Sequence, residues 1–393
     1  MTMRRAPGEG SIYQRADGKW EGSVAAGRTP SGKRRRLKVT ASTRRELGER
    51  LSALRREVEA GLTTDATLLT VGEWLHRWLR DEVRGSVRPR TYQSYETAVR
   101  RHLHPGLGHF RLRQLTPADV KAFMQRQLAG GLTPDSVRNQ HSILRRALEI
   151  AMRYDYAQRN VARLVSPPRA PHSEVNPLDR EETLRVFAAA RGHRLEALFV
   201  LAASTGMRLG EVLGLNWDAV DLDGGFVRVE RILARYDRAY HLDPPKTARS
   251  RRAIAIPGPV VAALRSRRVI QQGRRLVAGS SWTGDEWDLV FTTEKGCPLS
   301  PRTIQEIFAR LLDEAGVRRV RFHDLRHGAA TFLLAQGVAM KVVQDVLGHA
   351  QIAMTADLYS HVVPELRRDA ADRIGATLFG GEHPEPVSPL QSP

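Results

Sequence analysis

Hydrophobic and polar positions at the start of the chain first follow a β-strand pattern and then change to a helical period. Three short β-prone stretches alternate with turn sequences. The stretches are residues 11–13, 20–25 and 35–39, and the turns are Asp17-Gly18 and Pro30-Ser31-Gly32. A capping box, Thr43 with Glu46, then opens an amphipathic helix, and Gly61 lies just past its end. Residues 1–61 are therefore predicted to form a three-stranded antiparallel sheet with one helix.

A second helical pattern begins after a short linker, at the capping box formed by Thr70 and Glu73. Its apolar stripe is Trp74, Leu75, Trp78 and Leu79, and further helices are predicted at 91–103, 117–128 and 134–152. Four helices with short connections are typical of a small all-α bundle. We place this bundle at residues 69–165.

The remainder of the chain mixes helices and strands. The proline-rich stretch 166–171 predicts a stiff linker, and the sequence beyond 380 predicts a disordered tail. Between them, helices are expected after Asp179 and at 195–203, 259–270, 303–315, 325–336 and 339–347, and strands at 226–232, near 240 and at 253–256. The expected boundaries are 172–380 for this domain and 381–393 for the tail. The predicted fold class is multidomain, α-rich α+β.

Composition narrows the classes of function. The chain has 393 residues with 41% hydrophobic positions, enough for several cores, and a formal net charge of +19. Such a charge favours a polyanionic partner. The single cysteine, Cys297, excludes an intrachain disulfide framework and a thiolate metal cluster. No apolar run has the length of a membrane span, so we expect a cytoplasmic protein directed at nucleic acid and no membrane association.

Arginine supplies most of the positive charge, and guanidinium groups are the better ligands for phosphate. Two groups are candidate DNA contacts: Arg34, Arg35 and Arg36 in the first segment, and Arg138, Arg145 and Arg146 on the last helix of the bundle. Their spacing on the helix would expose them together, as a surface that follows a phosphate backbone requires. A merely solvated helix face is the alternative interpretation.

The residues with recognisable chemistry lie in the third segment. Arg208 follows a helix-ending glycine in Thr205-Gly206-Met207-Arg208, with Glu211 three residues on. His323 and Arg326 share one face of a helix start, and Leu347-Gly348-His349 ends the next helix. Tyr359 follows ten residues later. Taken singly, each of these features is more often structural than functional.

Taken in order, the motifs resemble the tyrosine recombinase family, the phage integrases and their relatives. The matching positions are Arg208, Lys246, His323, Arg326, His349 and Tyr359. The resemblance covers about residues 175–365, and it implies that 172–380 is a catalytic domain. The bundle at 69–165 is similar to the family's SAM-like core-site-binding domain. Residues 1–61 are similar to the arm-type DNA-binding domain of larger integrases.

The resemblance also implies a mechanism. Tyr359 would attack a phosphodiester and form a 3′-phosphotyrosine without ATP, cofactor or metal. Attack adds charge to the phosphate oxygens, so Arg208, Arg326 and His349 are expected to bind them. A tyrosyl hydroxyl has an ordinary pKa near 10, so His323 is the candidate base. Lys246, expected at a hairpin tip, is the candidate general acid.

The resemblance further implies partners and a biological role. These are double-stranded DNA at attachment sites, a homotetramer on that DNA, and an excisionase or a host DNA-bending protein. The predicted function is site-specific recombination that integrates or excises a mobile element. Two alternatives remain open. One is a type IB topoisomerase-like nicking-closing enzyme, and the other is a non-catalytic DNA-binding protein derived from an integrase.

Overall fold

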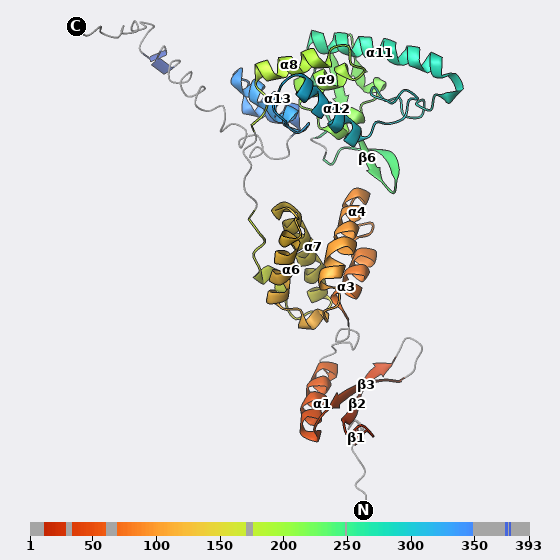
Figure 1. Ribbon diagram of the computed structural model, residues 1–393, viewed down its shortest axis with the longest axis vertical. Coiled ribbons are helices and arrows are strands. Elements are labelled where there is room, and N and C mark those ends of the chain that lie inside the picture. Colours follow the sequence, from red (N-terminus) through yellow and green to blue (C-terminus); the bar gives the residue numbers. More distant parts are fainter. Residues whose placement is uncertain are drawn as a thin grey trace, which may run out of the picture. The chain divides into compact units, whose positions relative to one another are not determined.

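The computed structural model of the chain describes residues 12–28, 34–59, 69–169, 176–247, 250–348, 374–375 and 377–378. The chain divides into two compact units, residues 1–172 and 173–393 (Figure 1). Helices dominate both units and the sheets are small and antiparallel, which confirms the α-rich α+β class. Among the described residues, none of the helices combines the length and the apolar character needed to cross a membrane.

The predicted sheet and helix at the start of the chain are both present. The elements are β1 (Ile12–Gln14), β2 (Trp20–Arg28), β3 (Arg34–Ala41) and α1 (Arg44–Glu59). The strand order is β1-β2-β3, with both pairs antiparallel. Leu47 and Leu51 of α1 are buried against this sheet. A Cβ at Gly22 would lie only 2.5 Å from Leu51 Cδ1, so glycine lets the helix approach β2 closely.

The helical bundle also forms as predicted, around a core of its own. Its helices are α3 (Val71–Trp78), α4 (Pro89–Ala98), α5 (His104–Leu107), α6 (Pro117–Ala129) and α7 (Pro134–Arg153). The capping box of Thr70 and Glu73 is complete. Trp74 is buried and its indole N–H donates to the carbonyl of Ala147 at 3.0 Å, which fixes α3 on α7.

One helix of the bundle differs from its prediction. The helix expected at 91–103 begins at Pro89, becomes π-helical at 99–103 and continues into α5. Its buried residues Val99, Leu103 and Leu107 recur every four positions, a longer period than the 3.6 of an α-helix. A π-helical turn has the longer period, so it keeps these side chains on the buried face.

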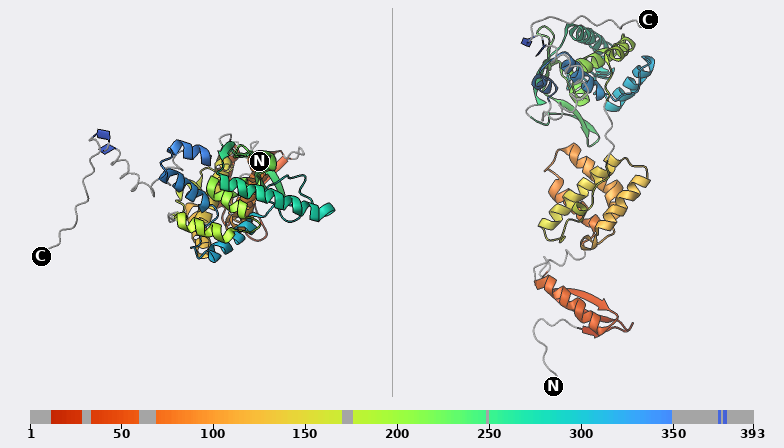
Figure 2. Two further views of the ribbon diagram at one scale, coloured as in Figure 1. Left: turned by 90° about the horizontal axis from the view of Figure 1, so that it is seen from above. Right: turned by 90° about the vertical axis from the view of Figure 1, so that its left-hand side faces the viewer.

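The second unit places α9 at its centre (Figures 1 and 2). Its helices are α8 (Arg180–Ala190), α9 (Glu196–Thr205), α10 (Leu209–Leu213), α11 (Gly258–Ala278), α12 (Pro301–Glu314), α13 (Asp324–Ala335) and α14 (Met340–Leu347). Phe199 of α9 is buried and stacks on Phe308 of α12 with 5.8 Å between ring centroids. Helices α8, α10, α11 and α13 also contact α9.

The strands of this unit form two separate sheets. They are β4 (Val220–Asp221), β5 (Phe226–Val229), β6 (Ile232–Tyr236), β7 (Ala239–Asp243) and β8 (Arg252–Ala255). The single strand expected at 226–232 is a wrong prediction, because β5 pairs with β4 and β8 whereas β6 pairs with β7. The exposed residues Glu230 and Arg231 lie between β5 and β6, and the two strands have different pairing partners.

The long helix α11 also extends further than predicted, to Ala278 instead of Ile270. Two buried side chains near its middle attach the helix to the rest of the unit. Arg267 donates to the carbonyl of Val290, and Gln271 donates to the carbonyl of Leu289. These contacts hold α11 to a distant loop, and its C-terminal end projects from the body of the unit (Figures 1 and 2).

Candidate active site

The candidate site is built on the sharp junction between α9 and α10. Gly206 ends α9 in the left-handed conformation, with φ of 63°. A Cβ there would lie 2.5 Å from Leu347 Cδ2, so both the backbone and the packing require glycine. Arg208, two residues on, is the N-cap residue of α10, as the motif predicted.

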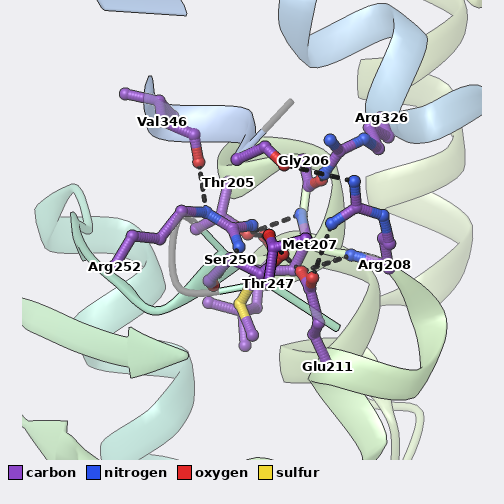
Figure 3. A network of polar contacts seen from close by, with 12 residues as sticks. Thr205, Gly206, Met207, Arg208, Glu211, Thr247, Ser250, Arg252, Arg326 and Val346 are labelled. Carbon is purple, nitrogen blue, oxygen red and sulfur yellow. Dashed lines mark hydrogen bonds and ion pairs between the residues drawn. The ribbon is translucent and has the colours of Figure 1, made fainter. Parts of the chain in front are cut away.

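Glu211 holds Arg208 in place (Figure 3). One carboxylate oxygen accepts the backbone N–H of Arg208 at 3.0 Å, and the other accepts its Nη1 at 2.8 Å. The Glu211 side chain is only 3% exposed. Burial raises the pKa of Glu211, but Arg252 and Arg208 outweigh it and hold the pKa below its ordinary value. Glu211 is therefore an ionised carboxylate that orients a guanidinium group.

Arg326 brings a second guanidinium group to the same place from α13. Its Nη1 donates to the carbonyl of Gly206 at 2.7 Å, across 120 residues of sequence. Nη2 is buried and has no hydrogen-bond partner among the described residues. Burial, and then the charge of Arg208, lower the pKa of Arg326 to about 9. Arg326 thus presents an unused donor in a region of excess positive charge.

Two imidazole rings adjoin this pair of arginines. His323 is the N-cap residue of α13, and its ring lies edge to face with that of His327, with centroids 5.2 Å apart. Desolvation lowers the pKa of His323, and the charges of His327 and Arg326 lower it further. His323 is therefore neutral at pH 7 and able to accept a proton. His327 has a buried Nδ1 with no partner among the described residues.

The C-terminal end of α14 completes the described part of the site. Gly348 ends this helix in the left-handed conformation, with φ of 68°, as the motif predicted. Its carbonyl accepts Arg208 Nη2 at 3.3 Å. The chain at this point leads directly to His349. His349 and Tyr359 both lie outside the described residues.

Lys246 is exposed, but the expectation that it occupies a hairpin tip is wrong. It follows β7, which pairs with β6, and precedes β8, which pairs with β5. Lys246 therefore lies in a connection between two sheets. The tip of the β6–β7 hairpin is instead formed by Asp237 and Arg238, both with positive φ.

The candidate DNA contacts of the bundle are solvent-exposed. Arg138, Arg145 and Arg146 lie on α7, as the spacing predicted. The last two line an open hollow of about 800 Å³. Arg146 also lies 5.8 Å from the ring centroid of Tyr95 and donates to its hydroxyl at 3.1 Å. In the first segment Arg36 is exposed on β3, whereas the side chains of Arg34 and Arg35 lie outside the described residues.

Arg252 is the site residue that the sequence analysis missed. It occupies the first position of β8, and its side chain is 7% exposed. The sequence does hold a signal, because Arg252 and buried Ile254 are two residues apart and so face the same side of the strand. That signal is weak, because Arg249 and Arg251 precede it and give no sign of which arginine turns inward.

The assembled site is suited to bind an anion. Two guanidinium groups, those of Arg208 and Arg252, pair with the Glu211 carboxylate, and Arg326 adds a third, so the local charge stays positive. Fixed donors in a partly dry site stabilise charge that develops on a phosphate oxygen. Within the part of the chain that the structure describes, no three His, Cys, Asp or Glu residues lie together as metal ligands would.

Comparison with known families and proteins shows which proteins the chain is similar to. Residues 177–365 match the phage integrase family, and residues 70–128 match the N-terminal SAM-like domain of phage integrases. The chain is 29% identical to a XerC-like tyrosine recombinase of Caldanaerobacter subterraneus, over 90% of this chain and 94% of the relative. It is 30% identical to an integrase of Streptomyces ambofaciens, over 91% and 94%.

Solved structures show the same fold. The Tn1549 transposon integrase in complex with a circular intermediate DNA matches with a TM-score of 0.67 and 21% identity, over 78% of this chain and 99% of that one. A lambda integrase tetramer bound to a Holliday junction matches with a TM-score of 0.54 and 20% identity, over 90% and 96%.

Proposed function

The chain belongs to the phage integrase family of tyrosine recombinases and is a site-specific DNA recombinase of mobile elements, and from this premise we propose that Tyr359 is its nucleophile. The substrate is double-stranded DNA at attachment sites. The Tyr359 oxygen attacks a backbone phosphorus and forms a 3′-phosphotyrosine, while the bond to the 5′ oxygen breaks. The reverse attack by a 5′ hydroxyl rejoins a strand, so the bond energy is conserved.

Arg208 and Arg326 bind the non-bridging oxygens of the scissile phosphate, together with His349. The observation that carries this assignment is the meeting of two guanidinium groups at Gly206 and Gly348, where Arg326 Nη2 is buried without a partner among the described residues. A phosphate oxygen would supply the missing acceptor. The pKa of Arg326 is lowered by burial and then by the charge of Arg208, and a phosphate would offset the second of these effects.

Two proton transfers accompany the exchange of bonds. His323 accepts the proton of the Tyr359 hydroxyl, a role that its lowered pKa supports because the ring is neutral at pH 7. Lys246 donates a proton to the departing 5′ oxygen, which is a poor leaving group when unprotonated. Its exposed position in a connecting segment leaves its ammonium group free to approach bound DNA.

The recombining assembly is a homotetramer on DNA. Strand exchange between two duplexes requires four cleavages and therefore four nucleophiles. The related lambda integrase forms a tetramer on a Holliday junction, which supports this stoichiometry for the present chain. An excisionase or a host DNA-bending protein sets the direction of the reaction.

Trapping the covalent intermediate tests the proposal. Tyr359→Phe should form no covalent adduct with a nicked attachment-site duplex and should still bind that duplex, because only one hydroxyl is lost. Tyr240→Phe is the matched control, because Tyr240 lies on β7 of the same unit. We expect peptide mapping of the wild-type adduct to identify Tyr359. An adduct that persists in Tyr359→Phe contradicts the assignment.

A further inference from the structure

Arg252 directs its guanidinium group into the protein and not toward solvent. Each of its three guanidinium nitrogens donates within the chain. Nη2 donates to Glu211 Oε2 at 2.9 Å, Nε to the carbonyl of Val346 at 2.6 Å, and Nη1 to the carbonyl of Ser250 at 3.1 Å. With a side chain that is 7% exposed, Arg252 is a structural donor.

The three acceptors belong to three elements that carry different catalytic candidates (Figure 3). Glu211 lies on α10 and orients Arg208. Val346 lies in the last turn of α14, just before the chain leads to His349. Ser250 lies in the connection that also contains Lys246. Arg252 is therefore the single side chain that bonds to all three segments among the described residues.

We propose that Arg252 is a positioning residue for DNA cleavage, which aligns the phosphate-binding Arg208 with the end of α14 and with the Lys246 segment without touching DNA itself. This inference rests on the proposed roles of Arg208, Lys246 and His349. It adds to them a residue outside the six that the family motifs supply.

The geometry requires an arginine. A planar guanidinium group reaches three acceptors in fixed directions, whereas a lysine ammonium on a flexible chain does not reproduce that fork. The fit is close, because a Cβ at Gly348 would lie 3.0 Å from Arg252 Nη1. Gly348 is thus held between two arginines, with Arg252 beside its α-carbon and Arg208 on its carbonyl.

The charge of Arg252 has a separate effect on Arg208. The buried Glu211 carboxylate forms one ion pair with Arg208 and one with Arg252, so its negative charge is shared between the two guanidinium groups. Without Arg252, Glu211 would pair with Arg208 alone. This stronger ion pair would compete with the phosphate for the Arg208 guanidinium. Removing one partner from a buried charge cluster also leaves an uncompensated group.

The test compares three variants at saturating DNA. We expect Arg252→Met to lower the single-turnover rate of covalent adduct formation by about 10²-fold, the scale of a misplaced catalytic geometry, with an unchanged Kd for core-site DNA. Arg252→Lys restores the charge without the fork, so its rate should lie between those of Arg252→Met and the wild type. Arg251→Met is the matched control, because Arg251 is the exposed neighbour, and its rate should equal the wild type.

The possible results separate the alternatives. A wild-type rate in Arg252→Met, or a defect that disappears when DNA is saturating, overturns the positioning role. A wild-type rate in Arg252→Lys overturns the requirement for the fork. Thermal unfolding is measured for each variant, and rates are compared below the lowest transition. The assay measures the total covalent adduct, whichever residue forms it. The Arg252 test therefore does not depend on the Tyr359 assignment, which the Tyr359→Phe variant tests separately.

Discussion

At the scale of single residues, the site is an arrangement of charge that is incomplete without an anion. Arg208 and Arg252 pair with Glu211. Burial, and then the neighbouring Arg208, lower the pKa of Arg326 to about 9. Arg252 is committed to Glu211 and to backbone carbonyls. Arg208 and Arg326 retain donors for a substrate, so the two arginines assigned to the phosphate are those that the chain leaves unsaturated.

The proposed role of Lys246 predicts a specific chemical rescue. Lys246→Ala should slow cleavage of a normal phosphodiester, because the departing oxygen lacks a proton donor. The defect should largely disappear with a 5′-bridging phosphorothioate, since sulfur leaves without protonation. Rates of adduct formation on the two substrates measure this, with Lys295→Ala as an exposed-lysine control. Equal defects on both substrates would reduce Lys246 to a phosphate contact.

The environment of His323 predicts the pH dependence of cleavage. A base must be neutral, and desolvation with the charges of His327 and Arg326 lowers the pKa of His323. The rate should therefore stay constant as pH falls from 8 to the ordinary histidine pKa of about 6.5, and should decline only below it. A single-turnover pH profile measures this. His323→Ala should lack that acid limb, and a decline already above pH 7 would contradict the assignment.

At the scale of elements, three helix ends converge to make the site. The end of α9 supplies Gly206, the start of α13 supplies Arg326, and the end of α14 supplies Gly348. Backbone carbonyls at helix C-termini lack partners within their own helix. Here guanidinium groups bond to carbonyls of Gly206, Val346 and Gly348, so the same contacts satisfy the helix ends and orient the arginines.

Substitutions at two left-handed glycines, Gly348 and Gly316, distinguish the cost of backbone strain from the effect of packing against Arg252. Gly348→Ala should cost about 1 kcal/mol for its left-handed backbone and should also displace Arg252, so cleavage falls more than stability alone explains. Gly316→Ala is the control, because φ is 62° there and a Cβ would meet nothing within 4 Å. Thermal unfolding and cleavage rates are measured for both. Similar cleavage rates in the two variants would exclude the packing effect.

At the scale of the whole molecule, the described part of the chain has several separate hydrophobic cores. Residues 12–58 and 69–165 have hydrophobic clusters of their own, as does the unit that holds the candidate site. We propose that the small sheet with its one helix acts as a module of its own. The proposed division is that the first segment binds arm sites, while the other two bind and cleave the core site.

Deletion of residues 1–61 tests this division. The truncated enzyme should form the covalent adduct on a core-site duplex at the wild-type rate, and should lose integration that depends on distant arm sites. The isolated segment 1–61 should bind DNA with an affinity that falls as salt rises, because phosphate contacts release counterions. Integration by the truncated enzyme at the full rate would contradict the arm-binding role and leave the catalytic assignment intact.

Local sequence was enough to determine much of this protein. The capping box of Thr70 and Glu73, and the glycines that end α9 and α14, act through hydrogen bonds and φ angles within a few residues. For that reason the helices, the turn before Arg208 and the turn after Leu347 were predictable. The motifs also indicated the family, because the resemblance rests on their order along the chain and needs no tertiary structure.

The tertiary structure decided whatever depends on partners far along the chain. β5 and β6 are separate strands because β5 pairs with β8 whereas β6 pairs with β7. For the same reason Lys246, which lies between β7 and β8, is not at a hairpin tip. Arg252 was hidden among arginines of equal local character. Its partners Glu211 and Val346 lie 41 and 94 residues away, so only the folded chain distinguishes it from Arg251.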